Sequence, residues 1–215
     1  MSIFRRLFVD FDSFYASVEQ NDNLEYRNKP LIVVPCISDY TCAIAASYQA
    51  KRLGVKTGTR VSVAKDKIPG LIVCEARPKR YVEVHNKIVE VLSSAFKKVQ
   101  VLSIDEMACE INEEDDFSCE MIAALLKLDF MDAFGETITC SIGVAPNVFL
   151  AKVASDMNKP NGFTAIDYNV KTKLSKLDLT DLPGIADRME ARLNKSRIKT
   201  IEDLYSFDEI RLKKA

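Results

Sequence analysis

Histidine is nearly absent from this 215-residue chain, which has a single one, His85. None of the six cysteines forms a C-x-x-C pair, so the spacing of a zinc site or of a Cys–His nucleophile is lacking. Any acid–base chemistry must therefore come from carboxylates, lysine, tyrosine or metal-bound water. Most of the cysteines lie in apolar runs, which is typical of small core residues and predicts a reducing, cytosolic compartment.

Long apolar runs are also lacking. No stretch approaches the length of a membrane span, and the N-terminus has no signal-peptide core, so we expect a cytoplasmic protein without a membrane partner. The apolar content of 47% and charged content of 28% are ordinary for a soluble globular protein. A net charge of -1 is not that of a dedicated nucleic-acid binder.

The charge is unevenly distributed along the chain. From Tyr168 onward there are 11 Lys and Arg residues against 8 Asp and Glu, a net charge of +3, which leaves -4 for the residues before it. Such a division suits a protein that holds cations in one place and phosphates in another, and it is equally compatible with chance variation.

Hydrophobic periodicity predicts an α+β fold. Strands are expected at 6–10, 31–35, 71–75, 99–103, 107–111, 137–144 and 163–166, and helices at 13–21, 46–53, 79–96, 118–132 and 147–157. Their order suggests a ferredoxin-like mixed sheet with helices on one face. Residues 20–70 interrupt that order as an inserted subdomain, and 112–117 form a solvated acidic loop.

The stretch RLFVDFDSFYASVE places Asp10 and Asp12 at the end of a buried strand. Three explanations are open: the nucleophile loop of an aspartate-dependent phosphatase, half of a metal site, or a helix cap. The phosphatase loop is disfavoured, because Phe14 stands where that chemistry has Thr or Val. Asp12 or Ser13 suits a cap for a helix that begins near Phe14, and Asp10 then remains unexplained.

A second acidic pair, Asp105 and Glu106, lies between the apolar strands of VQVLSIDEMACEI. Taken alone, it is best explained as an exposed turn. Adjacent strands of a ferredoxin-like sheet can bring it beside Asp10, where three carboxylates repel one another unless a cation neutralises them. Divalent cations with oxygen ligands do so, and a pair of them is the clamp used in nucleotidyl transfer.

Two further segments carry candidate phosphate ligands. Tyr48 and Lys51 lie three residues apart in SYQAKRLG and share one face of a helix. Lys159 lies in the Pro–Gly connection of ASDMNKPNGF, from which it can reach a phosphate as a point charge. Taken alone, the first segment is better explained as a surface helix with ordinary cations, and Lys159 can be explained as a loop lysine.

Together, these segments resemble the Y-family, or translesion, DNA polymerases. That family carries D-[FM]-D-x-F-[FY]-A-S-V-E, Y-E-A-R, S-I-D-E and S-I-G-x-[AS]-x-N-K-x-x-A-K-x-A-S-D-x-x-K-P-x-G. The chain offers DFDSFYASVE, YQAK, SIDE and SIGVAPNVFLAKVASDMNKPNG in the same order. The match runs from about residue 6 to about residue 166 and continues weakly to 207.

The resemblance implies a site that uses Mg²⁺. Two ions, which Mn²⁺ can replace, would be held by Asp10, Asp105, Glu106 and the carbonyl of Phe11, with Asp105 and Glu106 as the catalytic pair. Tyr15 matches the steric gate that excludes ribonucleotides. Asp12 is kept as a helix cap and is not counted among the ligands.

The resemblance also implies how substrates bind. Backbone amides of Phe14 and Tyr15, with Tyr48, Lys51 and Lys159, would bind the triphosphate of a deoxynucleotide. Residues 1–19 and 77–166 would form the palm, 20–76 the fingers and 167–215 a partial thumb. A degenerate helix-hairpin-helix at Gly184 and Ile185 would contact primer–template DNA. The family's little finger, absent here, is where a sliding clamp would be contacted.

Several positions depart from the family pattern. Lys51 replaces the usual Arg and loses bidentate contact with phosphate, Ala45 replaces a frequent Ser or Thr, and Val148 a frequent Lys. We therefore expect a DNA polymerase, with an accessory DNA-binding protein of little catalytic activity as the alternative. A nucleotide cyclase on a similar palm is a distant third, because it gives no role to Tyr15.

Overall fold

The structure is a computed structural model, which describes residues 5–111, 118–208 and 212. The strands are β1 (Arg6–Phe11), β2 (Leu31–Val34), β3 (Ala45–Ala46), β4 (Ile72–Glu75), β5 (Val99–Val101), β6 (Glu106–Glu110), β7 (Cys140–Ala145) and β8 (Phe163–Ala165). The helices are α1 (Phe14–Asp22), α2 (Tyr48–Arg52), α3 (Val61–Lys67), α4 (Pro78–Ala95), α5 (Cys119–Phe134), α6 (Val148–Met157), α7 (Val170–Leu174), α8 (Asp187–Lys195) and α9 (Ile201–Ser206). The predicted acidic loop at 112–117 lies outside the described residues.

The larger sheet has the strand order β5-β6-β1-β7-β8. Its first four strands are antiparallel neighbours in the order of a ferredoxin-like motif, which confirms the predicted core. The fifth, β8, runs parallel to β7 at the edge. The chain is thus an α+β protein whose central strand, β1, is paired on both sides.

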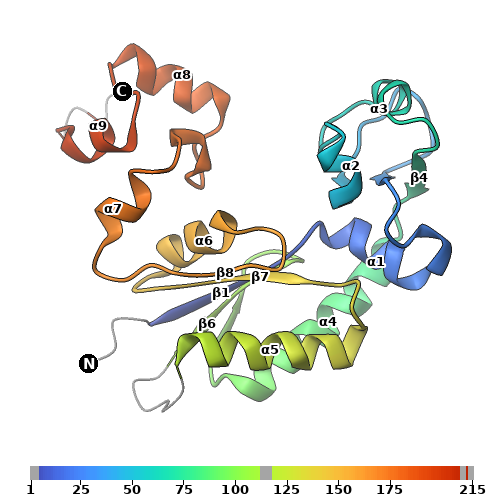
Figure 1. The fold of residues 1–215 in the computed structure, drawn as a ribbon, viewed down its shortest axis with the longest axis horizontal. Coiled ribbons are helices and arrows are strands. Elements are labelled where there is room, and N and C mark those ends of the chain that lie inside the picture. The colour runs from blue at the N-terminus through green and yellow to red at the C-terminus, as the bar shows by residue number, and fades with distance from the viewer. Residues whose placement is uncertain (1–4, 112–117, 209–211, 213–215) are drawn as a thin grey trace.

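The expectation that the helices cover one face of this sheet is wrong. Helices α4 and α5 lie on one face and α6 lies on the other (Figure 1). The reason lies in β1, where Leu7 and Val9 pack into one apolar cluster and Phe8 into another, all of them buried. A strand with apolar side chains on both faces requires cover on both.

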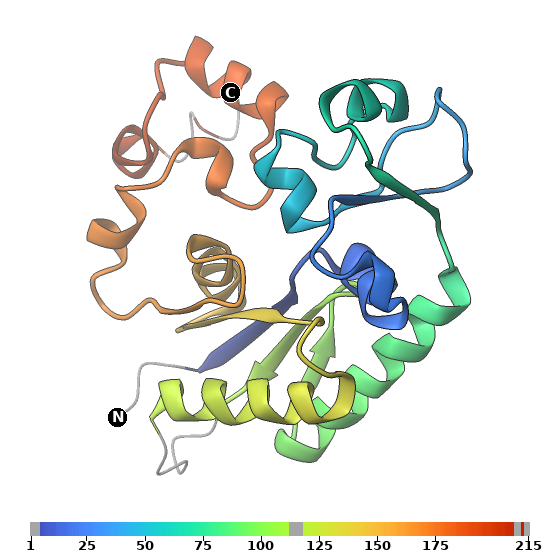
Figure 2. The same ribbon diagram turned by 45° about the vertical axis from the view of Figure 1, so that its right-hand side comes forward.

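Helix α6 approaches the sheet closely because β7 has a glycine at the crossing point. A β-carbon at Gly143 would collide with the backbone of Ala151 and Ser155. In Figure 2, α6 lies against the sheet, where it packs on β7 and β1. The missing side chain at Gly143 therefore permits the position of α6.

A second, smaller sheet forms from the segment between α1 and α4. It has the order β3-β2-β4 and packs with α2 and α3 around its own apolar cluster, which includes Ile32, Val34 and Val55. Sequence patterns located β2 and β4 but not the two-residue β3 or helix α3. Beyond β8 the chain continues as short helices, as expected from its Lys-rich composition (Figure 1).

Two other sequence expectations can be compared with the structure. Cys74, Cys109 and Cys140 are buried core residues, as expected, whereas Cys36 and Cys42 are exposed. Among the helices of the described ranges, none has the length and apolar character needed to cross a lipid bilayer.

Ion pairs fasten α1 to the start of α4. The guanidinium of Arg77 contacts the carboxylates of Glu19 and Asp22 at 2.9 and 2.8 Å, and Arg80 reaches Asp22 at 2.8 Å. The hydroxyl of Tyr81 donates to the buried Glu19 at 2.8 Å. These contacts join segments separated by a long insertion, so α1 is held against α4 by side chains as well as by the chain that follows it.

This fastening predicts a pH-dependent stability. The hydrogen bond from Arg80 lowers the pKa of Asp22, and partial burial only partly opposes it. Because the pKa of Asp22 is lower in the folded than in the unfolded state, its ionisation stabilises the fold at any pH above the unfolded-state pKa of about 3.9. This stabilisation is lost as the pH falls through the pKa of Asp22 in the folded state. Asp22→Asn should therefore be less stable than the parent at neutral pH, with the gap closing in acid.

The measurement is urea denaturation of both proteins between neutral pH and about pH 3. Asp66→Asn, on the exposed side of α3, is the matched control and should show no gap at any pH. A gap between Asp22→Asn and the parent that stays constant into acid would contradict the role given to Arg80.

Candidate functional site

Strand pairing places the predicted acidic residues together. Asp10 on β1 lies directly opposite Glu106 on β6, and the amide of Phe11 donates to the carbonyl of Asp105 at 3.0 Å. The expectation that adjacent strands bring Asp10 beside Asp105 and Glu106 is confirmed. Strand β1 is hydrogen-bonded to β6 on one side and to β7 on the other, and the two ladders together hold this register.

A lysine that the sequence analysis overlooked neutralises two of these acids. The Nζ of Lys152 lies 2.5 Å from a carboxylate oxygen of Asp10 and 2.7 Å from one of Glu106. Lys159 contacts the same Asp10 oxygen at 2.6 Å. The Asp10 side chain is only 6% exposed, so these ammonium groups compensate a charge that water hardly reaches.

Asp156 completes the ionic cluster from the other side. Its carboxylate accepts from Lys152 at 3.1 Å and from Lys159 at 2.8 Å. Helix α6 presents Lys152 and Asp156 one turn apart, and Lys159 follows just beyond its end. Burial alone would lower the pKa of Lys152, but the charges and hydrogen bonds of Asp10 and Glu106, with the charge of Asp156, raise it, so this ammonium stays charged.

Asp105 is held in a separate way. Its carboxylate accepts a hydrogen bond from Ser103 at 2.7 Å, and the carbonyl of the intervening Ile104 accepts from Nδ1 of His85 at 2.8 Å. The only histidine of the chain therefore anchors this turn to α4 and has no part in the ionic cluster.

Tyr15 lies close to Asp105. Partial burial, and next the negative charge of Asp105, raise the pKa of the Tyr15 phenol. Its ring stacks on the ring of Tyr81 with 4.5 Å between centroids, and Tyr81 is itself fixed by Glu19. The Tyr15 ring consequently has a supported orientation beside the carboxylates.

Asp12 does not cap α1, so that prediction is wrong. The N-cap of α1 is Ser13, in a left-handed conformation and without a capping side-chain hydrogen bond. The Asp12 carboxylate accepts instead from the hydroxyls of Thr139 and Ser141, both at 2.9 Å. The Asp12 carboxylate thus binds donors that are distant in the sequence and not the amides at the start of α1. The local sequence around Asp12 gave no indication of these donors.

The predicted phosphate ligands lie on the same side of the site. Tyr48 donates to Asp12 over 3.4 Å, and the Nζ of Lys51 lies 4.5 Å from the centre of the Tyr48 ring. Burial lowers the pKa of Lys51, and the positive charge of Lys159 lowers it further. An anion bound beside Lys51 would oppose this lowering of its pKa.

The donor set suits a hard divalent cation. No three acidic, histidine or cysteine side chains of the described residues already enclose a metal position. Asp10 and Glu106 nevertheless direct oxygens at one shared ammonium, and the carbonyl of Phe11 and the carboxylate of Asp105 lie on adjoining backbone. Oxygen ligands of this kind fit Mg²⁺. Without a metal ion, the ammonium of Lys152 compensates the charges of Asp10 and Glu106.

The two residues predicted to contact DNA border the ionic cluster. Gly184 and Ile185 line a cleft of about 310 Å³ together with Lys152 and Asp156. The amide of Ile185 donates to the carbonyl of Leu182 at 3.0 Å within the turn. The turn therefore faces the site, although one of its amides is engaged inside the protein.

Sequence reasoning missed Lys152 and Asp156. Their spacing of four on α6 was visible in LAKVASDMNKPNG, a pattern that indicates an ion pair on one helix face. What the sequence could not show is that this face turns toward β1, since that depends on the close approach at Gly143.

Comparison with known proteins gives consistent matches. The model of the impB/mucB/samB family matches residues 9–156. DNA polymerase IV of Staphylococcus epidermidis is 35% identical over 211 residues, covering 97% of this chain and 59% of the relative. DNA polymerase IV of Sulfurisphaera tokodaii is 34% identical over 215 residues, covering 95% and 60%.

Solved structures match as well. DinB from Sulfolobus solfataricus superposes with a TM-score of 0.85 at 34% identity, covering 98% of this chain and 62% of that one. An insertion ternary complex of Dbh DNA polymerase gives the same TM-score of 0.85, identity of 34% and coverage of 98% and 62%. The chain spans about three-fifths of the length of the curated relatives that it matches.

The ionic cluster yields a prediction for Lys152→Met. Removing the ammonium leaves Asp10 with one cationic partner and Glu106 with less compensation, so the free energy of unfolding should fall by about 2 kcal/mol without divalent cations. Added Mg²⁺ should restore more stability in the variant than in the parent, because the cation replaces the missing charge. Thermal denaturation with and without Mg²⁺ measures both effects.

Lys65→Met is the matched control, since it breaks an exposed pair with Asp39 in which the Lys65 side chain is 51% exposed. It should change stability little and respond to Mg²⁺ as the parent does. Equal Mg²⁺ responses of Lys152→Met and Lys65→Met would show that these carboxylates do not take up the cation.

Proposed function

This chain belongs to the impB/mucB/samB family of Y-family DNA polymerases, and we propose that it catalyses template-directed addition of deoxynucleotides to a primer during damage bypass. The relatives that it resembles are named DNA polymerase IV, and one similar structure is an insertion ternary complex. One observation carries the proposal: Asp10 lies opposite Glu106 on the neighbouring strand, and Asp105 precedes Glu106. The cationic side chain of Lys159 contacts Asp10 at the same end of the sheet.

Mg²⁺ is the proposed cofactor, as two ions that Mn²⁺ can replace. Bound divalent cations would lower the pKa of the primer hydroxyl and neutralise charge on the transferring phosphate. Asp10, Asp105 and Glu106 would supply carboxylate oxygens and Phe11 its carbonyl. Lys152, which compensates Asp10 and Glu106 in the structure, would keep the excess negative charge of the site low in either state.

The incoming nucleotide would be held by its phosphates. Lys159 and Lys51 bring two positive charges near each other, and the Tyr48 hydroxyl adds a donor. The amides of Phe14 and Tyr15 open helix α1, where backbone donors and the helix dipole favour an anion. Binding the triphosphate would relieve the repulsion between the two lysines.

Tyr15 would select the sugar. Its ring is stacked on Tyr81 and lies near Asp105, so it cannot easily turn away from a sugar placed above the carboxylates. A 2′-hydroxyl would meet the ring, whereas a deoxyribose would not. Discrimination would then come from a clash with the wrong substrate.

The remaining parts would bind DNA. We assign 1–19 and 77–166 to the palm, 20–76 to the fingers and 167–215 to a partial thumb, whose Gly184–Ile185 turn would face the primer–template from across the cleft. Contact with a sliding clamp stays a prediction, as does a cytoplasmic location.

The carboxylates give the direct test of catalysis. Asp105→Asn and Glu106→Gln should each reduce Mg²⁺-dependent primer extension on the order of a thousandfold, since each removes charge needed at the transferring phosphate. The matched control is Glu110→Gln, at the other end of β6, where the side chain pairs with Arg6 and Lys98. Undiminished extension by both site variants would place catalysis elsewhere.

The sugar gate gives an independent test. Tyr15→Ala should lower discrimination against ribonucleotides by about a hundredfold, because the obstructing ring is gone. Tyr15→Phe retains the ring and should retain discrimination. Single-nucleotide insertion with matched ribo- and deoxyribonucleotides measures the ratio, and equal ratios for Tyr15→Ala and the parent would remove this role from Tyr15.

An accessory DNA-binding protein is the second candidate. Lys51 in place of Arg, and Ala45 buried in β3 where the family often has a hydroxyl, weaken the phosphate site. The same primer-extension assay separates the two: a protein that binds primer–template and nucleotide but extends no primer under Mg²⁺ or Mn²⁺ would be the accessory form.

A further inference from the structure

A buried carboxylate next to the proposed nucleotide site accepts hydrogen bonds from four donors in three separate segments of the chain. Asp12 is 1% exposed. One of its oxygens accepts from the Thr139 hydroxyl at 2.9 Å and the Asn161 amide at 2.7 Å. The other accepts from the Ser141 hydroxyl at 2.9 Å and the Tyr48 hydroxyl at 3.4 Å.

These donors come from parts of the chain that would otherwise be independent. Thr139 precedes β7 and Ser141 lies in it, Asn161 belongs to the loop after α6, and Tyr48 begins α2 beside the smaller sheet. A buried carboxylate is stable only when its oxygens are hydrogen-bonded, and such charge-assisted bonds are the stronger ones. The carboxylate and its four donors therefore constrain one another.

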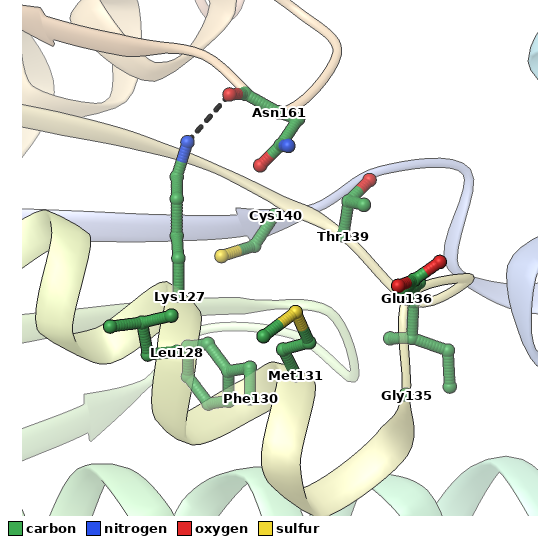
Figure 3. Close-up of a pocket in the computed structure, with 10 residues that line it drawn as sticks. Lys127, Leu128, Phe130, Met131, Gly135, Glu136, Thr139, Cys140 and Asn161 are labelled. Atoms are coloured by element: carbon green, nitrogen blue, oxygen red, sulfur yellow. Dashed lines mark hydrogen bonds between the residues drawn. The ribbon is translucent and has the colours of Figure 1, made fainter.

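The loop of residues 159–162 depends mainly on such polar contacts. Gly162 donates its amide to the Ser141 hydroxyl at 3.3 Å, and Lys127 donates from below to the carbonyls of Asn161 at 2.5 Å and Gly162 at 3.0 Å. Beneath the loop lies a cavity of about 310 Å³ lined by Lys127, Met131 and Asn161, among others (Figure 3). The loop thus borders a hollow on one side, while the amide of Ile142 also holds it by donating to the Gly162 carbonyl at 3.0 Å.

Two acids near the end of β1 hold this loop at two points. Asp10 contacts the side chain of Lys159, and Asp12, just beyond the end of the strand, accepts from the backbone of Asn161. The first contact involves charges that a metal ion or a phosphate can compete for. The second is buried and made to neutral donors, so it can persist while Lys159 changes partner.

We infer that Asp12 is a positioning residue that keeps the loop of Lys159, and the Tyr48 end of α2, in place beside the catalytic carboxylates. The inference rests on the proposed function, because it concerns binding of the nucleotide that this function requires. Asp12 acts through Lys159 and Tyr48 and does not contact the substrate itself.

The chemistry of the four donors predicts how variants differ. The Asn161 amide can only donate, whereas the hydroxyls of Ser141 and Tyr48 can turn and accept. Asp12→Asn can therefore direct its oxygen to Asn161 and its NH₂ to the two hydroxyls, which keeps the loop attached. Asp12→Ala removes all four contacts made by this carboxylate and leaves the donors without that acceptor.

Kinetics of the 215-residue chain provide the first test. Asp12→Ala should raise KM for deoxynucleotides about tenfold with a smaller change in kcat, and Asp12→Asn should recover most of the parent KM. Asp39→Ala removes an exposed carboxylate that pairs with Lys65 and is the control. Equal losses in kcat for both Asp12 variants with KM unchanged would overturn the inference.

A double-mutant cycle tests whether Asp12 acts through the loop. In a Lys159→Ala background, Asp12→Ala should raise KM by much less than it does alone, because the lysine that the loop presents is already gone. Its effect on the melting temperature should be the same in both backgrounds. If the increase in KM of the double variant equals the product of the increases in the two single variants, Asp12 does not act through Lys159.

A measurement without catalysis keeps the inference separate from the proposed function. Amide hydrogen exchange, followed by NMR, should show the Asn161 amide protected in the parent and in Asp12→Asn, and selectively unprotected in Asp12→Ala. Failure of the parent to extend primers would sink the proposed function and leave this result intact. Unchanged protection of Asn161 in Asp12→Ala would sink the positioning role whatever the chain catalyses.

Discussion

The contact of Lys152 with Asp10 and Glu106 is the interaction on which the site depends. Antiparallel pairing of β1 and β6 brings the two carboxylates together, and the pairing of β1 with β7 on its other side holds that register. Nearly buried Asp10 then needs a cation nearby at all times. Helix α6 supplies it, and Gly143 allows that helix to come close enough.

The surrounding charges are arranged so that partners can be exchanged. Lys152 and Lys159 each contact both Asp10 and Asp156, so either lysine can release one carboxylate and retain another. A metal ion that binds Asp10 would free Lys159 for a phosphate without leaving either charge uncompensated. The acids and the phosphate-binding lysine are therefore linked parts of one electrostatic unit.

Much of the fold was predictable because its main elements are long and strongly periodic. The helix expected at 79–96 is α4, and the strand at 6–10 is β1. The two-residue β3 and the short α3 carry too few residues for a pattern, and their apolar cluster forms only in three dimensions. The face covered by α6 was missed for a related reason, since it follows from the close approach at Gly143.

The roles of Asp10 and Asp12 in the site likewise depend on three-dimensional contacts that the sequence does not reveal. Both follow an apolar strand, and local sequence made each a plausible cap or ligand. Their roles separate only through distant partners: Asp10 meets ammonium groups, whereas Asp12 meets hydroxyls and a backbone amide more than 100 residues away in all but one case. Substrate and metal can replace the charged partners of Asp10, whereas the neutral donors to Asp12 are parts of the fold. Asp10 in β1 can therefore exchange its partners, while Asp12, just beyond the end of the strand, keeps them.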